Sequence, residues 1–141
     1  MREIIFRGKR LDNGEWAYGS FCMDALEYFN GLCGIDGFIR LYDKAKGKMQ
    51  TYEVDRETIG QYTGLKDKDG KRIFEGDICR NTRTGEIVSV KWHGTMAGYV
   101  WNKRRADGFL FDFGELFRAC DKYEVIGNIH DNPELLKGGE G

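Results

Sequence analysis

Proline and long apolar segments are nearly absent from this sequence. Pro133 is the only proline in 141 residues, whereas 20 residues are glycine. Glycine without proline indicates tight turns with positive φ angles rather than a disordered linker. No apolar run approaches the roughly 18 residues of a membrane-spanning helix, so we expect no membrane segment. The charged opening segment MREIIFRGKR argues against a signal peptide, and we expect a cytoplasmic protein.

Cysteine and histidine are few, and their spacing fits no common metal site. The two histidines, His93 and His130, are far apart, and no pair of cysteines has the C-x-x-C spacing of a zinc site. The chain also lacks a G-x-G-x-x-G fingerprint, a phosphate-binding loop and a strand–helix–strand alternation. We therefore predict no cofactor, no metal and no catalytic residue. The four cysteines are expected to be free thiols, as in other cytoplasmic proteins; they are Cys22, Cys33, Cys79 and Cys120.

The charges are balanced over the chain as a whole. Lys plus Arg total 22 and Asp plus Glu total 23, which gives a net charge of -1. This balance argues against a protein that binds nucleic acid through its bulk charge.

Short segments with strand character, separated by turn residues, occupy most of the chain. Asn13 and Gly14 form the strongest short-range hairpin signal, because both residues tolerate positive φ angles. A last strand is expected at 122–129, and short helical turns at 22–31 and 114–120, although 23–30 could equally be strand. Four hairpins are predicted, with turns at residues 11–14, 44–48, 82–85 and 104–108. The sequence thus predicts a mainly β fold of antiparallel hairpins, a barrel or a sandwich, with little helix.

Three longer blocks carry a family resemblance. REIIFRGKRLDNGEWAYGSF, TIGQYTGLKDKDGKRIFEGDIC and YEVIGNIHDNPELL resemble, in this order, the signature blocks of the YopX family. The likeness covers nearly the whole chain. Residues 22–50 and 93–120 are the parts in which the chain does not resemble the family. The family consists of small proteins encoded by bacteriophages and prophages. The resemblance implies a β-rich fold with an SH3-like barrel in the C-terminal part, and it implies no established activity, substrate or catalytic residue.

The expected organisation follows from the hairpins and this resemblance together. We predict one domain over residues 1–141, with an N-terminal hairpin lobe at 1–57, the SH3-like barrel part at 58–136 and a loose tail at 137–141. The expected partners are a second copy of the chain, another phage or host protein, or nucleic acid, in the host-cell cytoplasm.

Two groups of carboxylates could suggest a metal ion. If Gly70 takes the glycine position of a calcium-binding EF-hand loop, Leu65 and Gly76 fall where oxygen ligands are required, so this loop is interpreted as a turn. Glu75 and Asp77 would face the same side of an extended chain, but further ligands for a catalytic metal are missing. Capping at the entry to the following strand is the preferred interpretation.

A basic and aromatic window at residues 76–105 is the strongest candidate site. Its six basic residues outnumber two acidic ones, a balance of +4, and Trp92, Tyr99 and Trp101 lie among them. Basic groups beside stacking rings are typical of single-strand binders. Residues 106–136 hold two basic and seven acidic residues, a balance of -5, and could instead neutralise the window within or between protomers. The candidate residues are Arg80, Arg83, Lys91, Trp92, Trp101, Lys103, Arg104 and Arg105.

Three functions compete at this point. The sequence favours a non-catalytic binding or assembly module. The alternative is a nucleic-acid-binding accessory protein that uses the window at 76–105. A metal-dependent nuclease built on Glu75 and Asp77 is disfavoured, and His93 is interpreted as a turn histidine because no partner nucleophile is evident.

Overall fold

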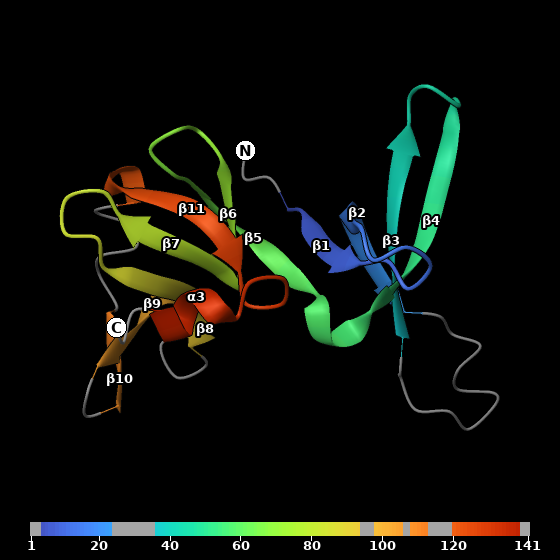
Figure 1. Cartoon of the computed structure of the whole chain (residues 1–141). Coiled ribbons are helices and arrows are strands. Elements are labelled where there is room, and N and C mark those ends of the chain that lie inside the picture. The colour runs from blue at the N-terminus through green and yellow to red at the C-terminus, as the bar shows by residue number, and fades with distance from the viewer. Residues whose placement is uncertain (1–3, 24–35, 94–97, 106–107, 113–119, 139–141) are drawn as a thin grey trace. The chain divides into compact units, whose positions relative to one another are not determined.

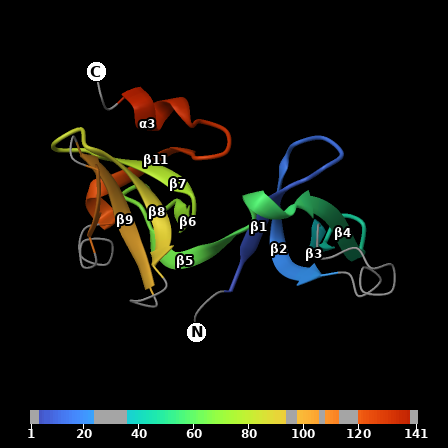
Figure 2. The ribbon, with the colours of Figure 1, turned by 90° about the horizontal axis from the view of Figure 1, so that it is seen from below.

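The protein consists of two compact units of antiparallel strands. A computed structural model describes residues 4–23, 36–93, 98–105, 108–112 and 120–138. The chain divides into Met1–Gln61 and Tyr62–Gly141 (Figure 1, Figure 2). Each unit has its own apolar cluster. Strands predominate in both, which confirms the predicted mainly β class. Within the described ranges, no helix has the length and apolar character needed to span a membrane.

Four strands form the first unit, in which both predicted hairpins are confirmed. Strand β2 pairs with β1 and β3, and β4 pairs with β3 over its whole length. The turn glycines Gly14 and Gly47 have φ angles of 73° and 66°. After β4, the 3-10 turn η1 (Arg56–Thr58) leads into β5 (Gly60–Lys66), which begins by pairing with β1. The four strands are β1 (Phe6–Lys9), β2 (Trp16–Met23), β3 (Asp36–Asp43) and β4 (Lys48–Asp55).

The core of the first unit depends on a close strand contact. Ala17, Ile39 and Val54 are buried together. Strand β2 changes partner at Gly19, since this residue pairs with β1 and the next one pairs with Arg40 of β3. A Cβ atom on Gly19 would lie 2.2 Å from the Arg40 carbonyl oxygen. Only a residue without a side chain fits there without a backbone shift.

The second unit contains a five-stranded antiparallel sheet in the order β10-β9-β8-β7-β11. Strand β5 continues into this unit and pairs with β6, and the 3-10 turn η2 (Cys120–Lys122) precedes β11. The ladders of the described residues do not close into a barrel, so the expected SH3-like barrel is found only as an open sheet. The elements are β6 (Arg72–Phe74), β7 (Asp77–Asn81), β8 (Ile87–His93), β9 (Gly98–Arg105), β10 (Gly108–Asp112), β11 (Tyr123–Asn128) and helix α3 (Glu134–Gly138).

An aromatic pair lies at the centre of this second core. Trp101 and Tyr123 are both 0% exposed, and their ring centroids are 4.5 Å apart. Ile73 and Cys79 from other strands complete the same cluster. Residues that are far apart in the sequence are thus joined by burial of apolar surface.

The second and third family-like blocks meet in this unit. Asp67, in the loop after β5, accepts a hydrogen bond from the backbone N–H of Val125 in β11 at 3.0 Å. Gly76, between β6 and β7, accepts one from the N–H of Ile129 at 2.9 Å. These blocks therefore supply contacts that hold the strands of the second unit together.

Several local predictions are corrected by the structure. The turn predicted at 104–108 is shorter, because Arg104 and Arg105 belong to β9 and pair with Phe109 and Gly108 of β10. Of the tail predicted at 137–141, residues 137 and 138 belong to α3, and the other three lie outside the described residues. The helical turns predicted at 22–31 and 114–120 lie mostly outside the described residues; at their ends, residues 22 and 23 belong to β2, and residue 120 begins η2.

Candidate binding surfaces

Arg80, the first basic residue of the predicted window, is already paired within the protein. It lies on β7 directly opposite Glu124 of β11. Its Nε donates a hydrogen bond to Glu124 Oε1 at 2.9 Å, and its terminal Nη2 donates to the same oxygen. The acidic segment therefore neutralises part of the window within one chain, which was the competing interpretation of the sequence.

Three members of the window are exposed around β8. Arg83 lies in the β7–β8 turn, where its backbone N–H donates to the Asn81 side chain at 2.9 Å. Lys91 and Trp92 lie on β8, and 45% of Trp92 is exposed. The Trp92 ring meets Tyr99 edge-on, with 5.0 Å between the centroids. This contact leaves part of the Trp92 ring accessible.

The other tryptophan of the window has a structural role. Trp101 is buried against Tyr123, so a nucleic-acid base cannot stack on it in this structure. Lys103, Arg104 and Arg105 belong to β9, but their side chains lie outside the described part of the chain. Of the eight candidate residues, the structure shows four to be exposed: Arg80, which pairs with Glu124, and Arg83, Lys91 and Trp92. Arg83 precedes β8, whereas Lys91 and Trp92 lie near its other end.

The carboxylate of Asp67 is occupied by backbone donors. It is 7% exposed and accepts hydrogen bonds from the N–H groups of Asp69, Lys71 and Val125 at 2.9, 2.9 and 3.0 Å. Burial alone would raise the pKa of Asp67, but the three hydrogen bonds, of which that from Val125 has the largest effect on the pKa, lower it. The loop is a turn, as predicted, with a buried carboxylate at its centre rather than a calcium ligand.

The pair formed by Glu75 and Asp77 does not have the predicted geometry. Glu75 and Gly76 form a tight turn in which Gly76 has a φ angle of 90°, so the chain is not extended there. Asp77 is 2% exposed, and its carboxylate accepts the backbone N–H of Phe74 at 2.7 Å. Capping by Asp77 is confirmed. In the described ranges, no three His, Cys, Asp or Glu residues gather closely enough to hold a metal ion.

Two cysteines have described side chains. Cys79 is buried and Cys120 is partly buried, and neither is part of a disulfide. Burial, followed by the charge of Asp121, raises the pKa of the Cys120 thiol, which disfavours the reactive thiolate. The side chains of Cys22, Cys33 and His93 lie outside the described part of the chain.

A different surface is prominent in the first unit. The β3–β4 hairpin continues beyond its neighbour, because β2 pairs with β3 only as far as Arg40 (Figure 1). We call residues 40–51 the ribbon. Tyr42 and Met49 are direct cross-strand partners on the ribbon, and 57% of Tyr42 and 50% of Met49 are exposed. Arg40 and Thr51, the next pair on this face, are exposed as well.

The tip of the ribbon is basic and ordered by its own hydrogen bonds. Asp43 Oδ1 accepts the N–H groups of Ala45 and Lys46 at 2.9 and 3.2 Å, and the Gly47 N–H donates to the Asp43 carbonyl at 2.8 Å. The ribbon holds four basic residues and one acidic residue, a balance of +3, in a chain whose net charge is -1. Within the described ranges, none of the basic residues has an ion-pair partner; they are Arg40, Lys44, Lys46 and Lys48.

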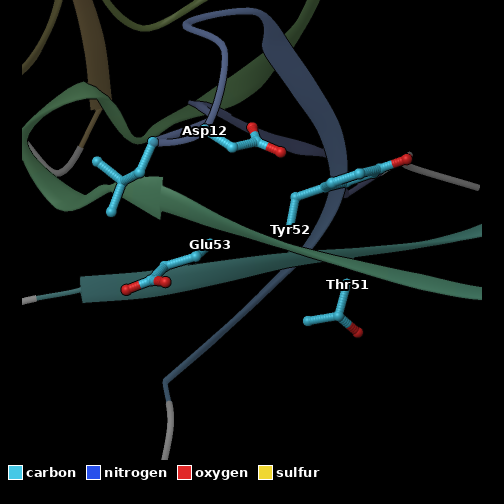
Figure 3. A pocket seen from close by; sticks show the side chains of 5 residues that line it. Asp12, Thr51, Tyr52 and Glu53 are labelled. Carbon is cyan, nitrogen blue, oxygen red and sulfur yellow. The ribbon is translucent and has the colours of Figure 1, made fainter.

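A shallow hollow at the inner end of the ribbon is less suited to a ligand. It has a volume of about 370 Å³ and is lined by Leu11, Asp12, Thr51, Tyr52 and Glu53 (Figure 3). Arg10 binds two of the lining residues: the guanidinium lies 4.1 Å from the Tyr52 ring centroid and donates to both Asp12 oxygens at 2.9 and 2.6 Å. The hydrogen bond from Arg10 lowers the pKa of Asp12. This cluster closes the β1–β2 turn over β4.

Sequence reasoning identified the ribbon as a hairpin but not as a surface. Two signals were present: alternating lysines at positions 44, 46 and 48, and an aromatic residue beside them. The part of the hairpin that is only two strands wide begins where β2 stops pairing with β3, next to the close contact between Gly19 and Arg40.

Comparison with known proteins agrees with the resemblance found in the sequence. The model of the family described as YopX protein matches residues 6–137. Among solved structures, the crystal structure of protein EF1440 from Enterococcus faecalis is similar, with a TM-score of 0.50 and 24% sequence identity. That likeness covers 96% of this chain and 99% of the other, and it shows a shared fold alone. No functionally curated protein matches the chain.

Proposed function

This chain belongs to the YopX family, and we propose that it is a non-catalytic binding module whose contact surface is the ribbon. The observation that carries the proposal is the cross-strand pair of Tyr42 and Met49, both at least half exposed on a projecting hairpin. Single exposed apolar side chains are common on protein surfaces. A cross-strand pair of an aromatic residue and a methionine has the composition favoured in interface cores, where aromatic residues and Met are enriched. The proposal includes a phage or prophage origin and a location in the host-cell cytoplasm, which rest on the family resemblance.

The proposal assigns no catalysis because the two buried carboxylates of the second family-like block bind backbone groups. Asp67 and Asp77 both accept backbone N–H donors and are almost fully buried. A carboxylate that satisfies buried donors is lost as a metal ligand or general base, because withdrawing it would leave those donors unsatisfied.

Assembly of identical chains is one form that such binding could take. Along the ribbon, β4 pairs only with β3 in the described ladders, so its outer side is an edge. Edges can pair with the same strand of a second copy, although Lys48 would oppose this arrangement through its charge. Light scattering of the purified protein over a range of concentrations tests this form directly.

The proposal is tested by changing the apolar pair. In Y42T/M49T both side chains become polar, and threonine keeps a high strand propensity. The matched control is I4T/I129T, which removes two exposed apolar side chains from outside the ribbon. Proteins and nucleic acids that co-purify with each variant from the host cell are then quantified. We expect Y42T/M49T to lose partners that I4T/I129T and the wild type retain; equal retention by all three would exclude the ribbon.

A second candidate function is nucleic-acid binding through the window at 76–105. It is favoured by the half-exposed Trp92 beside Lys91 on β8, with Arg83 in the adjoining turn. In this case W92A and R83Q would weaken binding to labelled single-stranded DNA, and binding would fall steeply with salt. Unchanged binding by both variants would remove this surface from consideration.

A further inference from the structure

We propose that the ribbon binds double-stranded DNA, with its basic tip against the phosphate backbone and its exposed face in the major groove. This inference rests on the proposed function and names the partner class of the same surface.

The charge of the ribbon is the first observation. Lys44, Lys46 and Lys48 are exposed, and no ion pair among the described residues involves them. The only acidic residue of the ribbon is Asp43, whose carboxylate is directed to the backbone N–H groups of the turn. A local balance of +3 in an otherwise acidic chain matches a polyanion, because phosphate contacts by lysine release bound counterions.

The shape of the ribbon is the second observation. Beyond Arg40 it is two strands wide, without a third strand in the described ladders. The major groove of B-form DNA admits a two-stranded ribbon, whereas the deep and narrow major groove of an RNA helix does not. The geometry therefore favours double-stranded DNA over double-stranded RNA.

The composition of the exposed face is the third observation. Tyr42 and Met49 lie between the basic tip and Arg40 on the same face. A face of this kind can place apolar groups against thymine methyl groups while Arg40 reaches a guanine or a phosphate. The hydrogen bonds to Asp43 order the backbone of the turn that carries Lys44 and Lys46, which reduces the conformational entropy lost on binding.

Fluorescence anisotropy with a labelled 20-base-pair DNA, at several salt concentrations, tests the inference. The test variant is K44Q/K46Q/K48Q. The control is K66Q/K71Q/K122Q, which removes the same charge from exposed lysines of the second unit. We expect the test variant to bind more weakly, with a slope of log K against log salt that is shallower by about 0.9 for each lysine in contact. We expect the control to match the wild type.

A second variant separates apolar contact from charge. Y42T/M49T should weaken binding with an unchanged salt slope, because it removes no phosphate contact. Thermal unfolding confirms that each variant is folded. No DNA binding by the wild type at low salt, equal binding by the test and control variants, or tighter binding to double-stranded RNA would each overturn the inference. If Y42T/M49T still loses protein partners in those cases, the proposed function stands without DNA.

Discussion

The carboxylate of Asp67 and the backbone N–H of Val125 are joined by a hydrogen bond of 3.0 Å, although 58 positions separate the two residues in the sequence. This bond connects the loop after β5 to the last strand. The same carboxylate also orders its own loop, because it accepts hydrogen bonds from the backbone N–H groups of Asp69 and Lys71.

We expect D67N to destabilise the second unit strongly. Asparagine offers a single acceptor oxygen and would turn an N–H donor toward backbone N–H groups, so at least one buried donor loses its partner. The expected loss is about 2–3 kcal/mol in the free energy of unfolding, measured with urea. D69N is the control, because the Asp69 side chain pairs with Lys68 at the surface. Equal stability of D67N and D69N would contradict the structural role of Asp67.

The stability should also depend on pH through Asp67. Its pKa is lowered in the folded state, so its contribution is complete above the unfolded pKa of about 3.9 and is lost as the pH falls through the lower folded value. The stability difference between wild type and D67N should therefore be constant from neutral pH to about pH 5 and shrink below about pH 4. A difference that grows on acidification would contradict this sign. Urea unfolding at several pH values provides the comparison.

G19A should destabilise the first unit. The new Cβ atom would lie 2.2 Å from the Arg40 carbonyl oxygen, which belongs to the backbone and cannot rotate away. We expect the free energy of unfolding to fall by about 1–3 kcal/mol, as for other overpacked sites. S20A changes the neighbouring exposed residue and serves as the control. If G19A and S20A melt at the same temperature, β2 and β3 are not in close contact there.

The two tryptophans of the basic window should respond differently to replacement by alanine. W101A removes a fully buried ring and should lower the free energy of unfolding by about 3–5 kcal/mol. W92A removes a half-exposed ring that has an edge contact with Tyr99, and about 1 kcal/mol is expected. Urea unfolding of both variants gives the two values. Similar losses would mean that Trp92 belongs to the core, which would also weaken its candidacy as a binding residue.

Local turn chemistry was determined by the sequence alone. Gly14, Gly47 and Gly85 have φ angles of 73°, 66° and 78°, and each lies at the turn of a hairpin predicted from its residues. Capping by Asp77 was likewise predictable, because its donor is only three residues away. These features depend on conformational preferences of a few consecutive residues, and the sequence displays them directly.

Burial and ion pairing were decided only by the tertiary structure. Val90 and Trp92 lie two residues apart on β8 and therefore share one face of the strand. Val90 is nevertheless 3% exposed and Trp92 45% exposed, because Trp92 lies near the end of β8. The ion pair between Arg80, a candidate nucleic-acid ligand, and Glu124 forms because β11 lies alongside β7. The ribbon is only two strands wide because β2 stops pairing with β3 at Arg40. Each outcome depends on which distant strand lies alongside, and strand partners are selected by the packing of the whole unit rather than by neighbouring residues.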